Sequence, residues 1–303
     1  KELIDDGIVA MKIGPTIPVA TPSEGQYLAP NELDHVLKPF RDIRDAVGGD
    51  IKIANDGHGK WSLPVAIQIA KEMEKLDIMW QEDLMPLLNP QSLRQLQEAT
   101  TSPVCISERL LTRWQFREFI ENGAAQIVMP DLIWTGGITE THRIAIMASA
   151  HQVPVAPHDA TGPVNIFACA QICMNSPNAM IMEHVRPYLY GWYGEMVDPL
   201  PPIENGWLHA PENPGIGTRL RPEVFDRPDV ETRVTGVDAM IPGMSDEGWA
   251  GVGLYDPKLS TDNFSTAMWS DMENIFEFRA QESRLEEHFE TKTDEAQNAG
   301  DSK

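Results

Sequence analysis

Short apolar runs recur along the chain at nearly regular intervals, and amphipathic stretches separate them. The runs begin at Ile8, Ile51, Ile78, Val104, Ile127, Val153 and Met180. Between them, apolar residues at spacings of three and four predict helices over 31–47, 63–75, 90–99, 112–122, 137–151 and 162–175. Strands that alternate with helices predict an α/β fold with a parallel sheet, and the period suits a TIM (β/α) barrel. Such a barrel has eight strands, of which the sequence indicates seven.

A titratable side chain follows almost every apolar run. These residues are Asp56, Glu82, Glu108, Asp131, His158 and Glu183, and successive members lie 23 to 27 residues apart. The carboxyl ends of the strands of a TIM barrel meet at one face, where the active site of such enzymes lies. We therefore expect these side chains to converge on one mouth and to be catalytic.

Three of these residues, Asp56, Glu82 and Glu108, come from consecutive predicted strand ends. Carboxylate oxygens are hard ligands of the kind that Mg²⁺ prefers. A solvated acid at a strand end is the alternative for each residue taken singly. Their equal spacing on successive units favours a shared site, so the sequence predicts Mg²⁺ bound by these three carboxylates.

The histidines near the strand ends are candidate acid–base groups. Asp131 lies one unit before His158, so its carboxylate can accept from one imidazole nitrogen and leave the other as a base. A structural His–Asp pair is the alternative. His58 comes two residues after Asp56, and strand alternation would direct both side chains into the same cavity. A loop histidine beside Gly59 is the alternative there.

Two further residues belong to the predicted mouth. Lys12 ends the first visible strand, and Glu183 follows the last. Lys12 is a candidate for binding an anionic carboxylate, with a surface lysine as the alternative. His184 follows Glu183 directly and is expected to point away from the cavity.

Composition places the chain among globular proteins and narrows its partners. It has 303 residues, of which 42% are hydrophobic, and a net charge of −22 at pH 7. So strong a negative charge disfavours nucleic acid and anionic membranes as partners. No run approaches the roughly 18 apolar residues of a membrane span, and no signal peptide is recognisable. The cysteines are odd in number and fit buried free thiols; they are Cys105, Cys169 and Cys173. We therefore expect a cytoplasmic protein.

The alternation of strands and helices weakens after Glu183, and the expected domain boundaries follow from this change. Residues 1–199 are predicted to form a partial barrel, 200–240 a C-terminal segment, and 241–303 an acidic and partly disordered extension. Within 271–303, ten acids stand against four Lys or Arg residues. Lys1 falls within a helix-like pattern, so we expect that the N-terminus and the first barrel strand have been lost.

Several motifs together resemble the enolase superfamily, mandelate racemase subgroup, and within it the galactonate dehydratase type of acid-sugar dehydratase. They are Asp56-Gly57-His58-Gly59-Lys60, Trp80-Gln81-Glu82-Asp83, Ser107-Glu108-Arg109-Leu110, Asp131-Leu132-Ile133-Trp134-Thr135-Gly136-Gly137, Ala156-Pro157-His158-Asp159 and Pro214-Gly215-Ile216-Gly217-Thr218. The likeness covers roughly residues 2–225, and in combination these motifs are specific for the superfamily.

The resemblance implies a modified TIM barrel with an N-terminal capping domain, absent from this sequence, toward which residues 200–240 would pack back. It implies that Mg²⁺ and Lys12 hold a substrate carboxylate while His158 removes the proton α to it. Mg²⁺ would stabilise the resulting enediolate, and Glu183 would donate a hydrogen bond to the developing charge. His58 would protonate the departing 3-hydroxyl, and the product would be a 2-keto-3-deoxy sugar acid.

One position separates dehydratases from racemases within this resemblance. Racemases of the subgroup carry Lys-x-Lys on the second barrel strand, whereas the sequence there is Lys12-Ile13-Gly14 in this chain. Racemisation needs acid–base groups on both faces of the carbanion, so Gly14 favours dehydration. The alternatives are an acid-sugar racemase, epimerase or cycloisomerase that uses His58 as its second group, and an inactive barrel fragment.

The sequence leaves the particular sugar acid and its stereochemistry open. The capping domain and the loop at 15–30 would set them, with Gln26 and Tyr27 as candidates. The resemblance further implies a small-molecule sugar acid as substrate and a homo-oligomer when the protein is full length.

Overall fold

The strands β1 to β5 form one parallel sheet in the order of the chain, as seen in a computed structural model that describes residues 2–14 and 25–228. They span Ala10–Ile13, Lys52–Asp56, Ile78–Glu82, Val104–Ile106 and Ile127–Val128. Each strand pairs in parallel with the next, and the pairing sets Asp56 beside Glu82. Carboxylates that end neighbouring strands are therefore side by side at one edge of the sheet.

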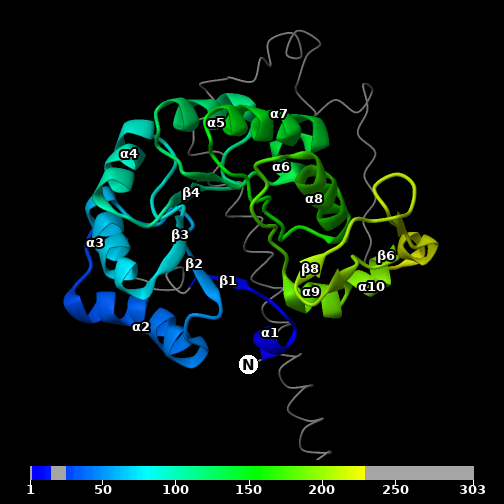
Figure 1. The fold of residues 1–303 in the computed structure, drawn as a ribbon, viewed down its shortest axis with the longest axis horizontal. Coiled ribbons are helices and arrows are strands. Elements are labelled where there is room, and N and C mark those ends of the chain that lie inside the picture. The colour runs from blue at the N-terminus through cyan, green and yellow to red at the C-terminus, as the bar shows by residue number, and fades with distance from the viewer. Residues whose placement is uncertain (1, 15–24, 229–303) are drawn as a thin grey trace, which may run out of the picture. The chain divides into compact units, whose positions relative to one another are not determined.

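The predicted helices are confirmed, and they lie outside the strands (Figure 1). They are α2 (Pro30–Val47), α3 (Leu63–Met73), α4 (Pro90–Ala99), α5 (Thr112–Glu121), α7 (Gly137–Ala150) and α8 (Pro163–Asn175). The shorter helices are α1 (Glu2–Asp5), η1 (Glu74–Leu76), α6 (Leu132–Thr135), α9 (Arg186–Tyr190), α10 (Tyr193–Met196) and η2 (Pro222–Asp226). The main core packs the outer faces of the strands against the inner faces of these helices, with Ile53, Ile69, Leu93, Phe116 and Val128 buried in it.

The last two predicted strands are reduced to isolated bridges. Val155 bridges Val128 on one side and Ala179 on the other, both in parallel. Its flanking residues Pro154 and Pro157 have no N–H to donate to a ladder, which limits this segment to single bridges. The expectation of full strands at 153 and 180 was therefore wrong, although both segments continue the parallel order of the barrel.

Residues beyond the last barrel position fold into short pairings. β6 (Val197–Asp198) pairs with β9 (Arg219–Leu220), and β7 (Ile203–Glu204) with β8 (Trp207–Leu208), both antiparallel. Ile203 and Leu208 pack on a small core of Ile166, Leu189 and Tyr193. This part of the predicted 200–240 segment thus packs against α8, α9 and α10. The predicted extension 241–303 lies outside the described residues, as do positions 15–24 of the predicted specificity loop.

The N-terminal turn contacts segments that are distant in sequence. Arg186 forms ion pairs with Glu2 and Asp6. Gly206 has a φ of +76°, and an added Cβ would lie 2.0 Å from the carbonyl oxygen of Gly7. Only a residue without a side chain allows this close approach, so Gly206 helps to hold the β7–β8 turn against residue 7.

Two smaller expectations concern membranes and thiols. Among the described residues, no helix has the length and apolar character needed to cross a bilayer. Cys105 and Cys169 are buried and Cys173 is half-buried, and all three are free thiols. The prediction of free thiols is confirmed.

Candidate active site

The inward-facing strand residues form two levels along the barrel. An apolar level contains Ala54, Trp80, Cys105, Ile127, Met129 and Ala156. Because strand side chains alternate between faces, a residue two positions further on points inward as well. Asp56, Glu82, Asp131 and His158 each lie two positions beyond a member of that level. The ionisable groups therefore gather at the carboxyl ends of the strands, as predicted.

Lys12 draws carboxylates from three strand positions together. Its Nζ lies 2.7 Å from Glu82 Oε1, 2.8 Å from Glu183 Oε1 and 3.6 Å from Asp56 Oδ2. Burial by itself lowers the pKa of Lys12, but the charges of Glu82, Glu183 and Asp56 outweigh it and raise that pKa well above its usual value. Lys12 is thus a protonated cation at the centre of the cluster rather than a surface lysine.

His158 and Asp131 form a buried pair with one imidazole nitrogen left over. Nδ1 of His158 lies 2.8 Å from Oδ2 of Asp131. Nε2 faces the other carboxylates, 3.6 Å from Glu183 Oε2 and 3.8 Å from Glu108 Oε2. Burial lowers the pKa of His158, but the hydrogen bond to Asp131 and the charges of Glu183 and Glu108 outweigh it and raise the pKa to about 9. The arrangement is that of an oriented acid–base group aimed into the cluster.

Asp131 also holds the short helix α6, which the sequence analysis did not predict. Its Oδ1 accepts the backbone N–H of Ile133 at 2.8 Å and of Trp134 at 3.3 Å. This is an N-cap, in which a side-chain oxygen satisfies the unpaired donors of a first helical turn. Four residues are too few for periodicity to reveal a helix, and an Asp before the turn was the only local signal.

His58 lies beside the cluster, but strand alternation does not place it there. β2 ends at Asp56, and His58 adopts a φ of 48° in the turn that follows. Its Nδ1 nevertheless lies 3.0 Å from Asp56 Oδ1, and its backbone N–H donates to the same oxygen at 3.0 Å. Its side chain is 35% exposed, so the ring lies at the rim. Burial raises the pKa of Asp56, but His58 and Lys12 outweigh it and lower that pKa to about 2.

A buried group that the sequence analysis did not single out supports Glu108. The hydroxyl of Ser107 lies between Oε2 of Glu108 and Oδ2 of Asp83, 2.6 Å from the latter. One hydroxyl carries a single proton, so a second proton is needed to satisfy both contacts. Burial, with the charge of Glu108, raises the pKa of Asp83 to about 7, which lets Asp83 carry it. Asp83 and Ser107 are direct neighbours of predicted ligands, and that adjacency was the signal available.

Glu183 acts as an acceptor in the contacts just described. Its Oε2 also accepts the backbone N–H of Asp159 at 3.1 Å. The role predicted for it, donating a hydrogen bond to developing charge, would require these contacts to rearrange. His184 lines a separate cavity of about 170 Å³ with Asp5 and Arg186.

The donor chemistry of the site suits a divalent cation. Asp56, Glu82 and Glu108 are buried carboxylates, and hard oxygen ligands are the set that Mg²⁺ takes. Burial, together with the surrounding acids and against the charge of Lys12, raises the pKa of Glu82 well above its usual value. Burial is the main cause of that shift, and the charges of Asp56, Glu183 and Glu108 add to it. Across 2–14 and 25–228, however, no three acidic, His or Cys side chains are arranged to hold a metal ion, and Lys12 contacts two of the three predicted ligands.

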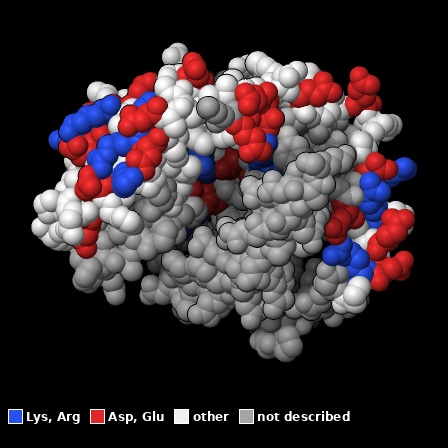
Figure 2. Space-filling model, turned by 90° about the horizontal axis from the view of Figure 1, so that it is seen from below, with Lys and Arg blue, Asp and Glu red and all other residues white. Residues whose placement is uncertain are grey.

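Acidic side chains, with basic side chains beside them, are visible near the middle of the view in Figure 2. On the outer surface in the same view, acidic and basic side chains are mixed.

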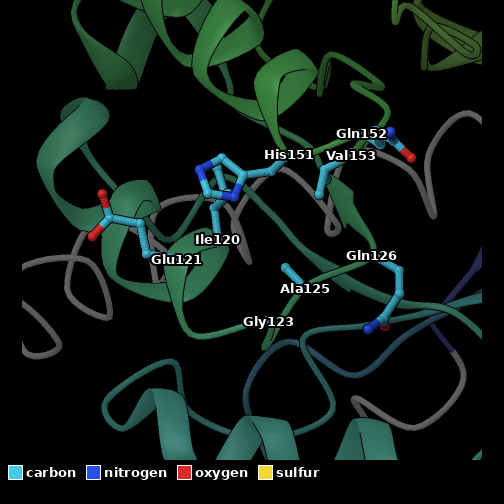
Figure 3. A pocket seen from close by; sticks show the side chains of 8 residues that line it. All are labelled: Ile120, Glu121, Gly123, Ala125, Gln126, His151, Gln152 and Val153. Atoms are coloured by element: carbon cyan, nitrogen blue, oxygen red, sulfur yellow. The ribbon is translucent and has the colours of Figure 1, made fainter.

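A larger cavity, of about 530 Å³, lies at the opposite end of the barrel (Figure 3). Gly123 and Gln126 in its lining precede β5, and His151 and Gln152 precede the bridge at Val155. It therefore opens at the amino ends of the strands, whereas catalytic groups of TIM barrels lie at the carboxyl ends. The cavity is not part of the candidate active site.

Comparison with known proteins shows which family the chain belongs to. Residues 1–224 match the family described as enolase C-terminal domain-like. The chain is 32% identical over 195 residues to D-xylonate dehydratase of Haloferax volcanii, covering 64% of this chain and 47% of that protein. It is 30% identical over 200 residues to D-galactonate dehydratase of Variovorax paradoxus, covering 64% and 52%. The chain thus spans about half the length of these curated relatives.

Solved structures give the same placement. An enolase of the mandelate racemase subgroup from Agrobacterium tumefaciens is 40% identical, with a TM-score of 0.70 over 74% of this chain and 61% of that one. A protein from Salmonella typhimurium described as a putative dehydratase is 30% identical, with a TM-score of 0.70 over 74% and 58%. The chain belongs to the enolase superfamily, through an enolase C-terminal domain-like barrel.

Proposed function

We propose that the protein is an acid-sugar dehydratase, which removes the proton α to a carboxylate and eliminates the 3-hydroxyl to give a 2-keto-3-deoxy sugar acid. The observation that carries the proposal is the series of contacts joining two imidazoles. His58 contacts Asp56, Asp56 contacts Lys12, Lys12 contacts Glu183, and Glu183 contacts His158. Relatives named as D-xylonate and D-galactonate dehydratases support the reaction class.

His158 is the proposed base. Oδ2 of Asp131 accepts from Nδ1, which fixes the tautomer and leaves Nε2 to take the α-proton. The raised pKa of His158 favours holding that proton once it has been taken. Because its pKa is raised, the imidazole must lose its own proton before each turnover. Loss of negative charge at Glu108 and Glu183 would lower the pKa of His158 and make this deprotonation easier.

Lys12 is proposed to bind the substrate carboxylate, and Glu183, when protonated, to donate a hydrogen bond to the charge that develops on it. The ammonium of Lys12 is the cationic side chain central to the cluster, so it suits a negatively charged group on the substrate and the enediolate that forms from it. Members of the superfamily generally bind Mg²⁺, and Asp56, Glu82 and Glu108 would hold it here. When bound, it would supply positive charge beside the same carboxylate.

His58 is proposed to donate the proton that leaves with the 3-hydroxyl as water. Its position at the rim, against Asp56, sets it at the far end of the contacts from His158. Elimination needs one base and one acid, and these two imidazoles supply them. Gly14 stands where a second basic side chain would serve racemisation.

The test is a screen of the natural protein that contains this sequence against aldonic and aldaric acids with Mg²⁺, with 2-keto-3-deoxy acid as the readout. His158→Asn should abolish both product and α-proton exchange in heavy water. His58→Asn should abolish product but keep α-proton exchange, because only the acid is lost. His151→Asn is the matched control, since that imidazole lines the cavity at the other end of the barrel.

Exchange without product in the unmodified protein would reject dehydration and identify an epimerase or cycloisomerase. Neither exchange nor product with any acid would reject the proposal altogether.

A further inference from the structure

Trp134 is a large aromatic side chain beside the proposed base, and the chemistry above gives it no role. Its ring centroid lies 6.0 Å from that of His158, with 36° between the ring planes. The imidazole is buried, whereas Trp134 remains 40% exposed. The indole thus extends outward from the buried His158 to the surface.

The backbone that carries the indole is held by the same carboxylate as the imidazole. Oδ1 of Asp131 accepts the backbone N–H of Trp134, and Oδ2 of the same carboxylate holds Nδ1 of His158. The helix that carries Trp134 is a single turn, closed by Gly136 with a φ of 120°. One carboxylate therefore holds both the imidazole and the backbone turn that carries Trp134, so the attachment point of the indole is in place before any ligand arrives.

The chemical contrast with its surroundings suggests what the indole contacts. Lys12 is a cation suited to a carboxylate, and Glu108 and Glu183 can accept from hydroxyl groups, whereas the indole presents an apolar face. An open-chain sugar acid has both kinds of surface, since its carbon chain exposes C–H groups between its hydroxyls. Trp114 is an exposed tryptophan of a different kind, because Arg113 and Arg117 stack on its ring.

We propose that Trp134 is a substrate-binding residue that packs against the C–H groups of the carbon chain of the sugar acid while His158 faces its α-carbon. The inference rests on the proposed function for the class of ligand. It assigns part of the selection among acids of different chain length to the barrel, at a residue next to the base.

The test measures equilibrium binding by calorimetry, with Mg²⁺ present, for D-galactonate, D-xylonate and glycolate, which has no carbon chain beyond the α-carbon. The proteins are the unmodified natural protein, Trp134→Ala, Trp134→Phe and Trp114→Ala. Trp134→Ala should weaken binding of the two sugar acids roughly five- to ten-fold, the size of effect expected from a lost aromatic contact. Glycolate binding should not change, Trp134→Phe should keep most of the affinity, and Trp114→Ala should match the unmodified protein.

Binding of the sugar acids within two-fold of the unmodified protein in Trp134→Ala would overturn the inference, as would an equal loss for glycolate. If Trp134→Ala does not fold, the comparison of Trp134→Phe with Trp134→Leu decides, because the inference requires leucine to bind more weakly. Binding without formation of keto acid would reject the dehydratase and leave the role of Trp134 standing. Formation of keto acid with unchanged affinity in Trp134→Ala would reject the role of Trp134 and leave the dehydratase standing. If neither sugar acid binds, both the dehydratase and the role of Trp134 are rejected.

Discussion

Asp131 serves two purposes with its two oxygens, and substitutions can separate them. Oδ1 caps α6 by accepting from Ile133 and Trp134, and Oδ2 accepts from His158 Nδ1 at 2.8 Å. In Asp131→Asn, an amide oxygen can keep the cap, but an NH₂ group then faces Nδ1. An amide donor at this position favours the imidazole tautomer that carries its proton on Nε2.

The consequence for catalysis is large, whereas the consequence for folding is small. A base whose reacting nitrogen already carries the proton cannot accept another, so turnover should fall by roughly 10³- to 10⁴-fold. That loss corresponds to about 4 to 5.5 kcal/mol in the activation free energy. Asp131→Ala should lose as much activity and also the cap, which costs about 1 kcal/mol of folding free energy and lowers Tm by roughly 2 to 4 °C.

The assay pairs α-proton exchange in heavy water, followed by NMR, with thermal melting of the same samples. Asp131→Asn should exchange at a rate near background and melt closer to the unmodified protein than Asp131→Ala does. Exchange in Asp131→Asn above about a tenth of the unmodified rate, a loss far smaller than a misplaced proton predicts, would refute the reasoning. So would equal melting temperatures for the Asn and Ala variants, because the cap would then contribute nothing.

Three further predictions concern stability, metal binding and pH. Glu140 on α7 accepts the backbone N–H of Arg113 at 2.9 Å and its guanidinium at 2.6 Å. Glu140→Ala should therefore cost about 1 to 3 kcal/mol in denaturant unfolding, whereas Glu98→Ala, which removes an exposed pair, should cost less than about 1 kcal/mol. Adding Mg²⁺ at a hundred times its Kd should stabilise the protein by about 2.7 kcal/mol in thermal melts, and Glu82→Gln should lose most of this gain. Burial raises the pKa of Asp159 from 3.8 to about 7, so deprotonation costs more in the folded state. Stability should then fall as pH rises from about 4 through 7, by up to roughly 4 kcal/mol from this group, and the fall should be smaller in Asp159→Asn.

The outcomes that would contradict these three are equally direct. Equal costs for Glu140→Ala and Glu98→Ala would show that the half-buried pair contributes no more than the exposed one. An unchanged Mg²⁺ gain in Glu82→Gln would move the metal site elsewhere. Identical pH dependence of unfolding in Asp159→Asn and the unmodified protein would show that Asp159 is ionised in both states.

Local patterns were sufficient wherever a segment is decided by its own periodicity. The helices from 31–47 to 162–175 follow from apolar residues spaced three and four apart, because one face of each must be buried. The same reasoning overestimated the strands at 153 and 180, since Pro154 and Pro157 remove donors that a ladder needs. It also missed α6, which is held by a cap rather than by a buried face.

The site residues also divide into those that a local pattern predicts and those that it does not. Alternation along a strand puts Asp56, Glu82 and Asp131 on the inner face, and a sequence shows that much. His58 was predicted at the site for the wrong reason, because a left-handed turn rather than a strand carries it there. Glu108 was predicted as a ligand, but its contacts through Ser107 to Asp83 were not, since they join two different strand ends.

The sequence by itself determined the βα order, the strand ends that carry ionisable groups and the superfamily, because each of these depends on spacing along the chain. Only the tertiary structure decided that Lys12 lies between Glu82 and Glu183, and that one carboxylate holds both His158 and α6. Those contacts form when the sheet curves and brings residues 12 and 183 within 2.8 Å. Distances of that kind are set by the packing of the whole barrel, which no local pattern encodes.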